Sequence, residues 1–146
     1  MIWDERFMDM ARLVASWSKD PSTGCGAVIV DPERRVVSLG FNGLPARIED
    51  DPAWLSDRGI KLRVVLHAED NAINFARRDL TGCTLYVWPM PPCAQCASRL
   101  IQAGIVRAVS IRPDAARLAR WGADFDLAAD MYRQAGVRQD LLEDRT

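Results

Sequence analysis

Near its start, the chain places apolar residues at the spacing of one helix face. Residues 4–18 therefore predict an amphipathic helix, with Asp4 placed to cap it. The apolar positions on that face are Phe7, Met10, Leu13, Val14 and Trp17. The sequence SKDPSTG then ends the helical pattern.

Two short apolar runs follow the first helix. CGAVIVD, residues 25–31, is rich in β-branched side chains and predicts a buried strand. VVSLGFN, residues 36–42, predicts a second strand. Because only the turn DPERR separates the two runs, we expect an antiparallel hairpin.

The rest of the chain alternates between helical and strand patterns. Residues 43–62 are irregular, with two prolines and an acidic run, and predict a loop with one short helical turn near Trp54. Helices are predicted at 67–78, 91–104 and 119–136, and strands at 83–88, 106–111 and, more weakly, 137–142. This order predicts an α/β fold with a mixed five-stranded sheet, in which the later strands are parallel.

Composition narrows the class of protein. The 146 residues fit one compact domain, 1–146, and the net charge of −1 gives no basic excess of the kind that marks nucleic-acid binding. No run approaches the ~20 apolar residues of a membrane helix, and MIWDERFMDM lacks the pattern of a signal peptide. We therefore expect a cytoplasmic protein with reduced cysteines. Cys25 and Cys83 fall in apolar strand patterns and are expected to be small buried residues.

The chemistry is predicted at the starts of two helices. His67 and Glu69 lie in HAE, and Cys93 and Cys96 lie in PCAQC. Both helices follow extended segments, so we expect them to begin at the same edge of the sheet. One histidine and two cysteines leave the fourth position of a tetrahedral zinc open, as in catalytic sites. His67 is the only histidine, so we expect one zinc ion per chain and no second, structural zinc.

Glu69 projects in another direction from His67 and is placed to move protons beside the open zinc position. The combination of H-x-E with P-C-x-x-C is the signature of zinc deaminases, in which hydroxide attacks C4 of cytosine or C6 of adenine. The alternatives are a helix histidine with core cysteines, or a redox cysteine pair. A redox pair would not explain His67 and Glu69.

Most of the chain resembles the deoxycytidylate (dCMP) deaminases of the cytidine deaminase-like superfamily. The matching stretches are SKDPST, GAVIV, GFNGLP, HAEDNAI, PPCAQCASRLIQAGI and AGV at 135–137. The resemblance implies a three-layer α/β/α fold, with zinc held by His67, Cys93 and Cys96 and with Glu69 as the proton shuttle.

The resemblance also implies substrate contacts. The backbone amide of Ala68 would face the base carbonyl, and Asn42 would bind the deoxyribose. Lys19 and Ser22 would contact the phosphate, where donors and cations suit a dianion. Ala27 and Trp88 complete the expected substrate-binding set. Two alternatives remain open. Lys19 is then a solvated surface residue, and Asn42 is a turn residue beside a glycine.

The chain departs from the family in two places. IRPDAARLARWG lacks the tyrosine or histidine usual after the fourth strand, so Arg112, Arg117 or Arg120 is expected to supply charge to the phosphate. YVWPMPPC is one residue longer than the corresponding stretch usual in the family. Trp88 and Met90 there either pack internally or reshape the site around C5 of the pyrimidine.

We therefore expect hydrolytic deamination of dCMP to dUMP and ammonia. The main alternative is deamination of 5-methyl- or 5-hydroxymethyl-dCMP. A free (deoxy)cytidine deaminase would not need a phosphate loop, and the neutral net charge argues against a tRNA adenosine deaminase. A non-enzymatic zinc module would not need Glu69. The resemblance further implies a homo-oligomer, often a hexamer, with regulation by dCTP and dTTP. The apolar pattern and the net charge lead us to expect no membrane or nucleic-acid partner.

Overall fold

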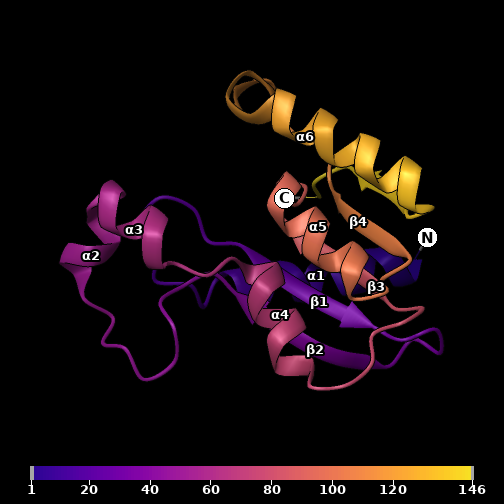
Figure 1. Ribbon diagram of the computed structural model, residues 1–146, viewed down its shortest axis with the longest axis horizontal. Coiled ribbons are helices and arrows are strands. Elements are labelled where there is room, and N and C mark those ends of the chain that lie inside the picture. Colours follow the sequence, from indigo (N-terminus) through magenta and orange to yellow (C-terminus); the bar gives the residue numbers. More distant parts are fainter. Residues whose placement is uncertain (1, 146) are drawn as a thin grey trace.

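The computed structural model describes residues 2–145, which form a five-stranded sheet with helices on both faces (Figure 1). The strands are β1 (Gly26–Val30), β2 (Val36–Phe41), β3 (Thr84–Trp88), β4 (Arg107–Ile111) and β5 (Arg138–Leu142). They lie in the order β2-β1-β3-β4-β5. Strand β1 is antiparallel to both β2 and β3, whereas β3, β4 and β5 are parallel. The predicted mixed sheet, with its opening hairpin and later parallel strands, is confirmed.

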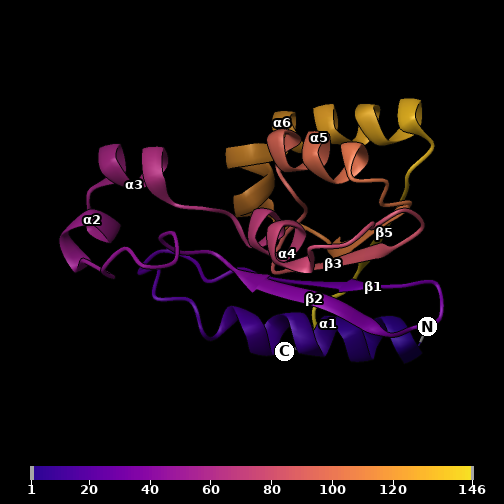
Figure 2. The ribbon, with the colours of Figure 1, turned by 60° about the horizontal axis from the view of Figure 1, so that its bottom comes forward.

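The helices complete three layers. They are α1 (Ile2–Ala15), α2 (Pro52–Ser56), α3 (Arg58–Val64), α4 (Ala68–Ala76), α5 (Ala94–Gln102) and α6 (Ala115–Ala135). Figure 2 shows α1 beneath the sheet and α4, α5 and α6 above it, while α2 and α3 project from one end. Among residues 2–145, no helix combines the length and apolar character needed to cross a membrane.

The alternation of side chains along β1 divides the core in two. All five residues of β1 are buried, which explains why its sequence is a continuous apolar run. Val28 and Val30 pack with side chains of α1. Ala27 and Ile29 pack on the other face, in the cluster that includes residues of α4, α5 and α6.

Gly40 allows α4 to lie close to β2. A Cβ atom at this position would come within 2.5 Å of the Ala72 nitrogen and 2.7 Å of the Ala68 carbonyl oxygen. Only glycine fits such an approach without displacing the helix backbone. Since His67 and Glu69 lie at the beginning of α4, this contact fixes where they stand relative to the sheet.

Three local predictions need correction. Segment 43–62 has the helical turn expected near Trp54, as α2, but its later part is not a loop, because α3 occupies it. Asp51, at the end of the acidic run, and Asp57 accept hydrogen bonds from helix amides and cap α2 and α3. Helix α6 begins at Ala115 rather than 119, capped by Asp114. Asp4 lies inside α1 and caps nothing; it pairs instead with Arg107.

Candidate metal centre and active-site cavity

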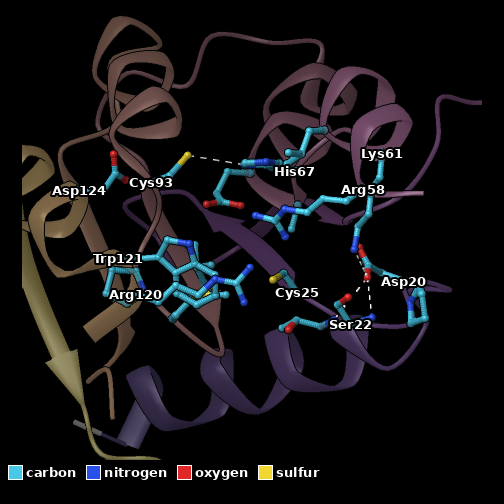
Figure 3. A pocket seen from close by; sticks show the side chains of 18 of the residues that line it. Asp20, Ser22, Cys25, Arg58, Lys61, His67, Cys93, Arg120, Trp121 and Asp124 are labelled. Atoms are coloured by element: carbon cyan, nitrogen blue, oxygen red, sulfur yellow. Dashed lines mark hydrogen bonds and ion pairs between the residues drawn. The ribbon is translucent and has the colours of Figure 1, made fainter. Parts of the chain in front are cut away.

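Three metal-binding side chains converge where α4 and α5 begin. His67 and Cys93 are the residues immediately before these helices, and both have extended backbones. The His67 Nδ1 atom lies 3.2 Å from the Cys96 Sγ atom and 3.6 Å from the Cys93 Sγ atom. All three ligand atoms lie within 4.8 Å of one another, and Figure 3 shows the Cys93 sulfur facing the His67 ring.

Hydrogen bonds link these three side chains and shift the pKa of each one. The pKa of Cys93 is lowered to about 4 by hydrogen bonds from the Cys96 thiol and from His67, although burial opposes the shift. The pKa of His67 is raised to about 9, chiefly by its hydrogen bond to Cys93. The pKa of Cys96 is raised by its hydrogen bond to Cys93 and by burial. A Cys2His donor set in this arrangement fits zinc, which takes thiolate and imidazole ligands and leaves one position for a reactant.

Glu69 lies beside the metal ligands, in the first turn of α4. Only 5% of its surface is exposed, and it lines a cavity together with His67 and Cys93. Burial raises the pKa of Glu69 to about 7, because the apolar surroundings penalise the charged form. A carboxyl group in this setting can both accept and return a proton.

The cavity has a volume of about 520 Å³. Its walls come from the loop before β1, from α2 and α3, from the start of α4, from the loop before α5 and from α6. Ser22 and Ala68, which we expect from the sequence to contact the substrate, line it, and so do Met90 and Pro91. A cavity of this volume is in the range of small-molecule sites.

Cations stand on two sides of this cavity. Arg58 and Lys61 come from α3, and Arg120 comes from α6. Figure 3 shows the guanidinium groups of Arg58 and Arg120 directed into the cavity from opposite sides. Lys61 is neutralised by Asp20, whose carboxylate lies 2.6 Å from the Lys61 Nζ atom.

Neither arginine side chain forms an ion pair with an acidic residue among residues 2–145. The Arg58 side chain has no hydrogen bond there, and the Arg120 guanidinium only stacks on the Trp121 ring, 4.6 Å from its centroid. Of the three arginines considered from the sequence, Arg112 instead pairs with Glu143 and Arg117 lies near Asp114. Arg58 and Lys61 were missed because segment 43–62 was expected to be a loop. Their spacing in RGIK, which places both on one helix face, was the signal that could have found them.

Asn42 and Lys19 do not line the cavity. The Asn42 Oδ1 atom accepts a hydrogen bond from the Cys25 N–H at 2.8 Å, and its Nδ2 atom donates to the Thr23 carbonyl at 2.9 Å and more weakly to Asp20. Its amide therefore holds the loop before β1. Lys19 is exposed and pairs with Asp50 at 2.7 Å.

Trp88 and Ala27 also lie outside the cavity walls. Trp88 packs on the α1 side of the sheet and borders a second, smaller hollow of about 310 Å³. Ala27 is fully buried within β1. Cys83 is buried as expected, but Cys25 precedes β1 and lines the cavity, where burial raises the pKa of its thiol to about 12.

Comparison with known proteins agrees with this geometry. Residues 1–111 match the family described as the cytidine and deoxycytidylate deaminase zinc-binding region. An uncharacterized deaminase of Aliivibrio fischeri is 48% identical over 140 residues, covering 96% of this chain and 93% of that protein. The deoxycytidylate deaminase of Pongo abelii is 39% identical over 146 residues, covering 90% of this chain and 79% of its own.

Solved structures show the same fold. The dCMP deaminase of cyanophage S-TIM5 in its apo form has a TM-score of 0.70 at 22% identity, covering 95% of this chain and 96% of that one. The same phage enzyme in complex with dCMP and dUMP has a TM-score of 0.69 at 21% identity, covering 94% and 95%. Together with the residues at the starts of α4 and α5, these matches show that the chain belongs to the cytidine and deoxycytidylate deaminase family, with His67, Cys93 and Cys96 as its zinc site.

Proposed function

We propose that the protein hydrolyses dCMP to dUMP and ammonia. The observation that carries this proposal is that Arg58 and Arg120 enter the same cavity as the metal ligands and Glu69. Guanidinium groups suit a phosphate monoester, because their forked N–H donors match its oxygens. The name of the Pongo abelii relative and the dCMP and dUMP bound to the phage enzyme support the same substrate.

The cytosine ring is proposed to lie over the start of α4. A catalytic zinc ion, when bound by His67, Cys93 and Cys96, supplies the Lewis acidity that makes water nucleophilic near neutral pH. The Ala68 N–H, in the first turn of a helix, has no partner within that helix and can donate to the base carbonyl. The ring would thus be held with C4 toward Glu69.

Glu69 is proposed to carry the protons of the reaction. Its carboxylate accepts one proton from the attacking water and returns it to the ring nitrogen N3. It then accepts the second proton from the new C4 hydroxyl, which becomes the carbonyl, and returns it to the departing amino group. A C4–O bond forms, the C4–N bond breaks, and the amino group leaves as ammonia. Because only 5% of Glu69 is exposed, little solvent reaches its carboxyl group to exchange protons with it.

A 5-substituted dCMP is the second candidate substrate. Met90 and Pro91, from the longer loop before α5, line the cavity. A flexible methionine side chain at the wall can shift to admit a small group on the pyrimidine. Trp88 of the same stretch packs elsewhere, so the proposal rests on Met90 alone.

Release of ammonia from a panel of nucleotides tests these proposals. The panel is dCMP, 5-methyl-dCMP, dCTP, deoxycytidine and CMP. We expect the highest kcat/KM with dCMP, or with 5-methyl-dCMP if Met90 opens the site. A higher kcat/KM with deoxycytidine than with dCMP would contradict a phosphate-binding role for Arg58 and Arg120.

We also propose that the chain forms a homo-oligomer, as the family resemblance implies. Trp17 and Phe41 support this, because their exposed rings pack edge to face, 6.2 Å apart, at the surface. Light scattering of the purified protein, with and without dCTP or dTTP, measures its oligomeric state and shows whether these nucleotides change it. A monomer under all these conditions would contradict the proposal.

A further inference from the structure

Helix α5 is capped from a distant part of the chain. The Ala94 N–H, at the first position of α5, donates a hydrogen bond of 2.8 Å to the Asp124 Oδ2 atom on α6. Asp124 is half-buried and also lines the cavity (Figure 3). Asp124 has no part in the reaction steps proposed for Glu69.

This contact compensates for an unusual cap residue. The residue before a helix is commonly Ser, Thr, Asp or Asn, whose oxygen accepts from the first free amides. Here that residue is Cys93, whose sulfur lies 3.4 Å from the Cys96 N–H and also serves as a metal ligand. The Asp124 carboxylate supplies the missing oxygen, and its negative charge suits the positive end of the helix dipole.

The same contact joins the metal-binding side of the cavity, at the start of α5, to the side formed by α6. Asp124 lies one helical turn beyond Arg120 and Trp121, the α6 residues that face the proposed phosphate position. Ala94 follows Cys93 directly. This hydrogen bond therefore connects the zinc-binding turn of α5 to the turn of α6 that carries Arg120.

We propose that Asp124 is a positioning residue: by accepting the Ala94 N–H, it fixes the first turn of α5 and holds Cys93 and Cys96 in the geometry that binds zinc. The inference rests on the zinc site. The part that connects α5 to the proposed phosphate position on α6 also rests on the proposed function. Groups that orient metal ligands from outside the ligand set typically contribute about 10–100-fold to metal affinity or activity.

The test measures how fast zinc passes to a colorimetric chelator from the purified zinc-loaded protein, with no substrate present. We expect Asp124→Ala to release zinc about tenfold faster than the unmodified protein. Asp124→Asn should release it nearly as slowly as the unmodified protein, because its amide oxygen can accept the same hydrogen bond. Asp126→Ala is the matched control, since Asp126 is an exposed acid on the same helix.

Ala94→Pro removes the donor instead of the acceptor. Proline is tolerated at the first position of a helix, and the φ of −66° and ψ of 166° at Cys93 suit a residue that precedes proline. This variant should also release zinc faster, and combining it with Asp124→Ala should add nothing further. This arm keeps the test valid if Asp124→Ala fails to fold.

Three results would overturn the proposal: slow zinc release from Asp124→Ala or Ala94→Pro, equally fast release from Asp124→Asn and Asp124→Ala, or effects that multiply in the double variant. None of these readouts depends on which nucleotide the enzyme accepts. Failure of the dCMP assignment is therefore distinguishable from failure of this one.

Discussion

One guanidinium nitrogen of Arg99, on α5, lies 2.8 Å from both carboxylate oxygens of Asp70, on α4. Asp70 follows Glu69 directly, and Arg99 lies one helical turn after Cys96. The pair therefore ties together the two helices that carry the metal ligands. Asp70 is the more buried partner, with 9% of its side chain exposed against 46% for Arg99.

Replacing Arg99 by methionine should loosen this connection. The change keeps the length of the side chain but leaves the buried Asp70 carboxylate without its partner, which costs about 1–3 kcal/mol. We expect a lower midpoint of urea unfolding and faster zinc loss to a chelator. Gln102→Ala, at an exposed position of the same helix, is the control. An unchanged unfolding midpoint in Arg99→Met would show that the pair contributes nothing.

Gly40→Ala should displace α4 from the sheet. The new Cβ atom would overlap the backbone of Ala68 and Ala72, and forcing extra volume into a packed interior costs about 1–3 kcal/mol or more. We expect reduced thermal stability together with weaker zinc retention, because His67 would move with its helix. Gly43→Ala is the matched control, since a Cβ atom there meets nothing within 4 Å. Equal stability of the two variants would contradict the close packing of α4.

The parts of this molecule that were predictable from sequence depend on local patterns. The period of apolar residues gave the strand and helix order, and the H-x-E and P-C-x-x-C spacing gave a metal site that the structure assembles from His67, Cys93 and Cys96. Each of the two metal-site motifs lies at the start of one helix. The order of helices and strands already implies that these two helices begin at the same edge of the sheet.

The substrate side was less predictable, because it depends on side chains brought together by tertiary structure. Asn42 sits in a conspicuous motif, yet its amide is used within the loop before β1. Lys19 is paired with Asp50. Arg58 lines the cavity from α3, a helix that was not predicted because the prolines and acidic residues of segment 43–62 are typical of a loop. Which of several charges remains unpaired cannot be read from spacing alone.

Glu69→Gln should abolish turnover while keeping the fold and the metal. Removing a general acid–base group typically costs about 10²–10⁴-fold in rate. Because burial disfavours the charged form of Glu69, the neutral glutamine should leave stability unchanged or increase it. Ammonia release, zinc content and the melting temperature are the measurements. Near-normal turnover in this variant would rule out Glu69 as the proton carrier.

Asp4 should govern part of the stability of the fold at acid pH. The Arg107 guanidinium, which hydrogen-bonds Asp4 at 2.8 and 2.9 Å, holds the pKa of that carboxyl below its usual value; burial opposes this, and the Tyr86 hydroxyl adds to it. A lowered pKa in the folded state stabilises the protein above the unfolded pKa of about 4, and the gain is lost as the pH falls through the folded value.

Asp4→Asn should therefore be less stable by about 1–3 kcal/mol at pH 6–7, and the difference from the unmodified protein should shrink below about pH 4. Urea unfolding across this pH range measures it. Since both proteins carry the same zinc site, acid release of zinc affects them alike and cancels in the comparison. A difference that stays constant down to pH 3 would contradict the ion-pair explanation.

Arg58→Ala and Arg120→Ala should weaken recognition of the phosphate without harming the chemistry. A hydrogen bond to a charged group contributes about 1.5–3 kcal/mol, so each change should lower kcat/KM for dCMP by about tenfold or more, mainly through KM. Deoxycytidine has no phosphate, so its kcat/KM should hardly change, and the ratio between the two substrates is the decisive readout. Arg63→Ala on α3 and Arg133→Ala on α6 are matched controls, because neither side chain lines the cavity. Parallel losses for both substrates would instead mean that the arginines maintain the shape of the site.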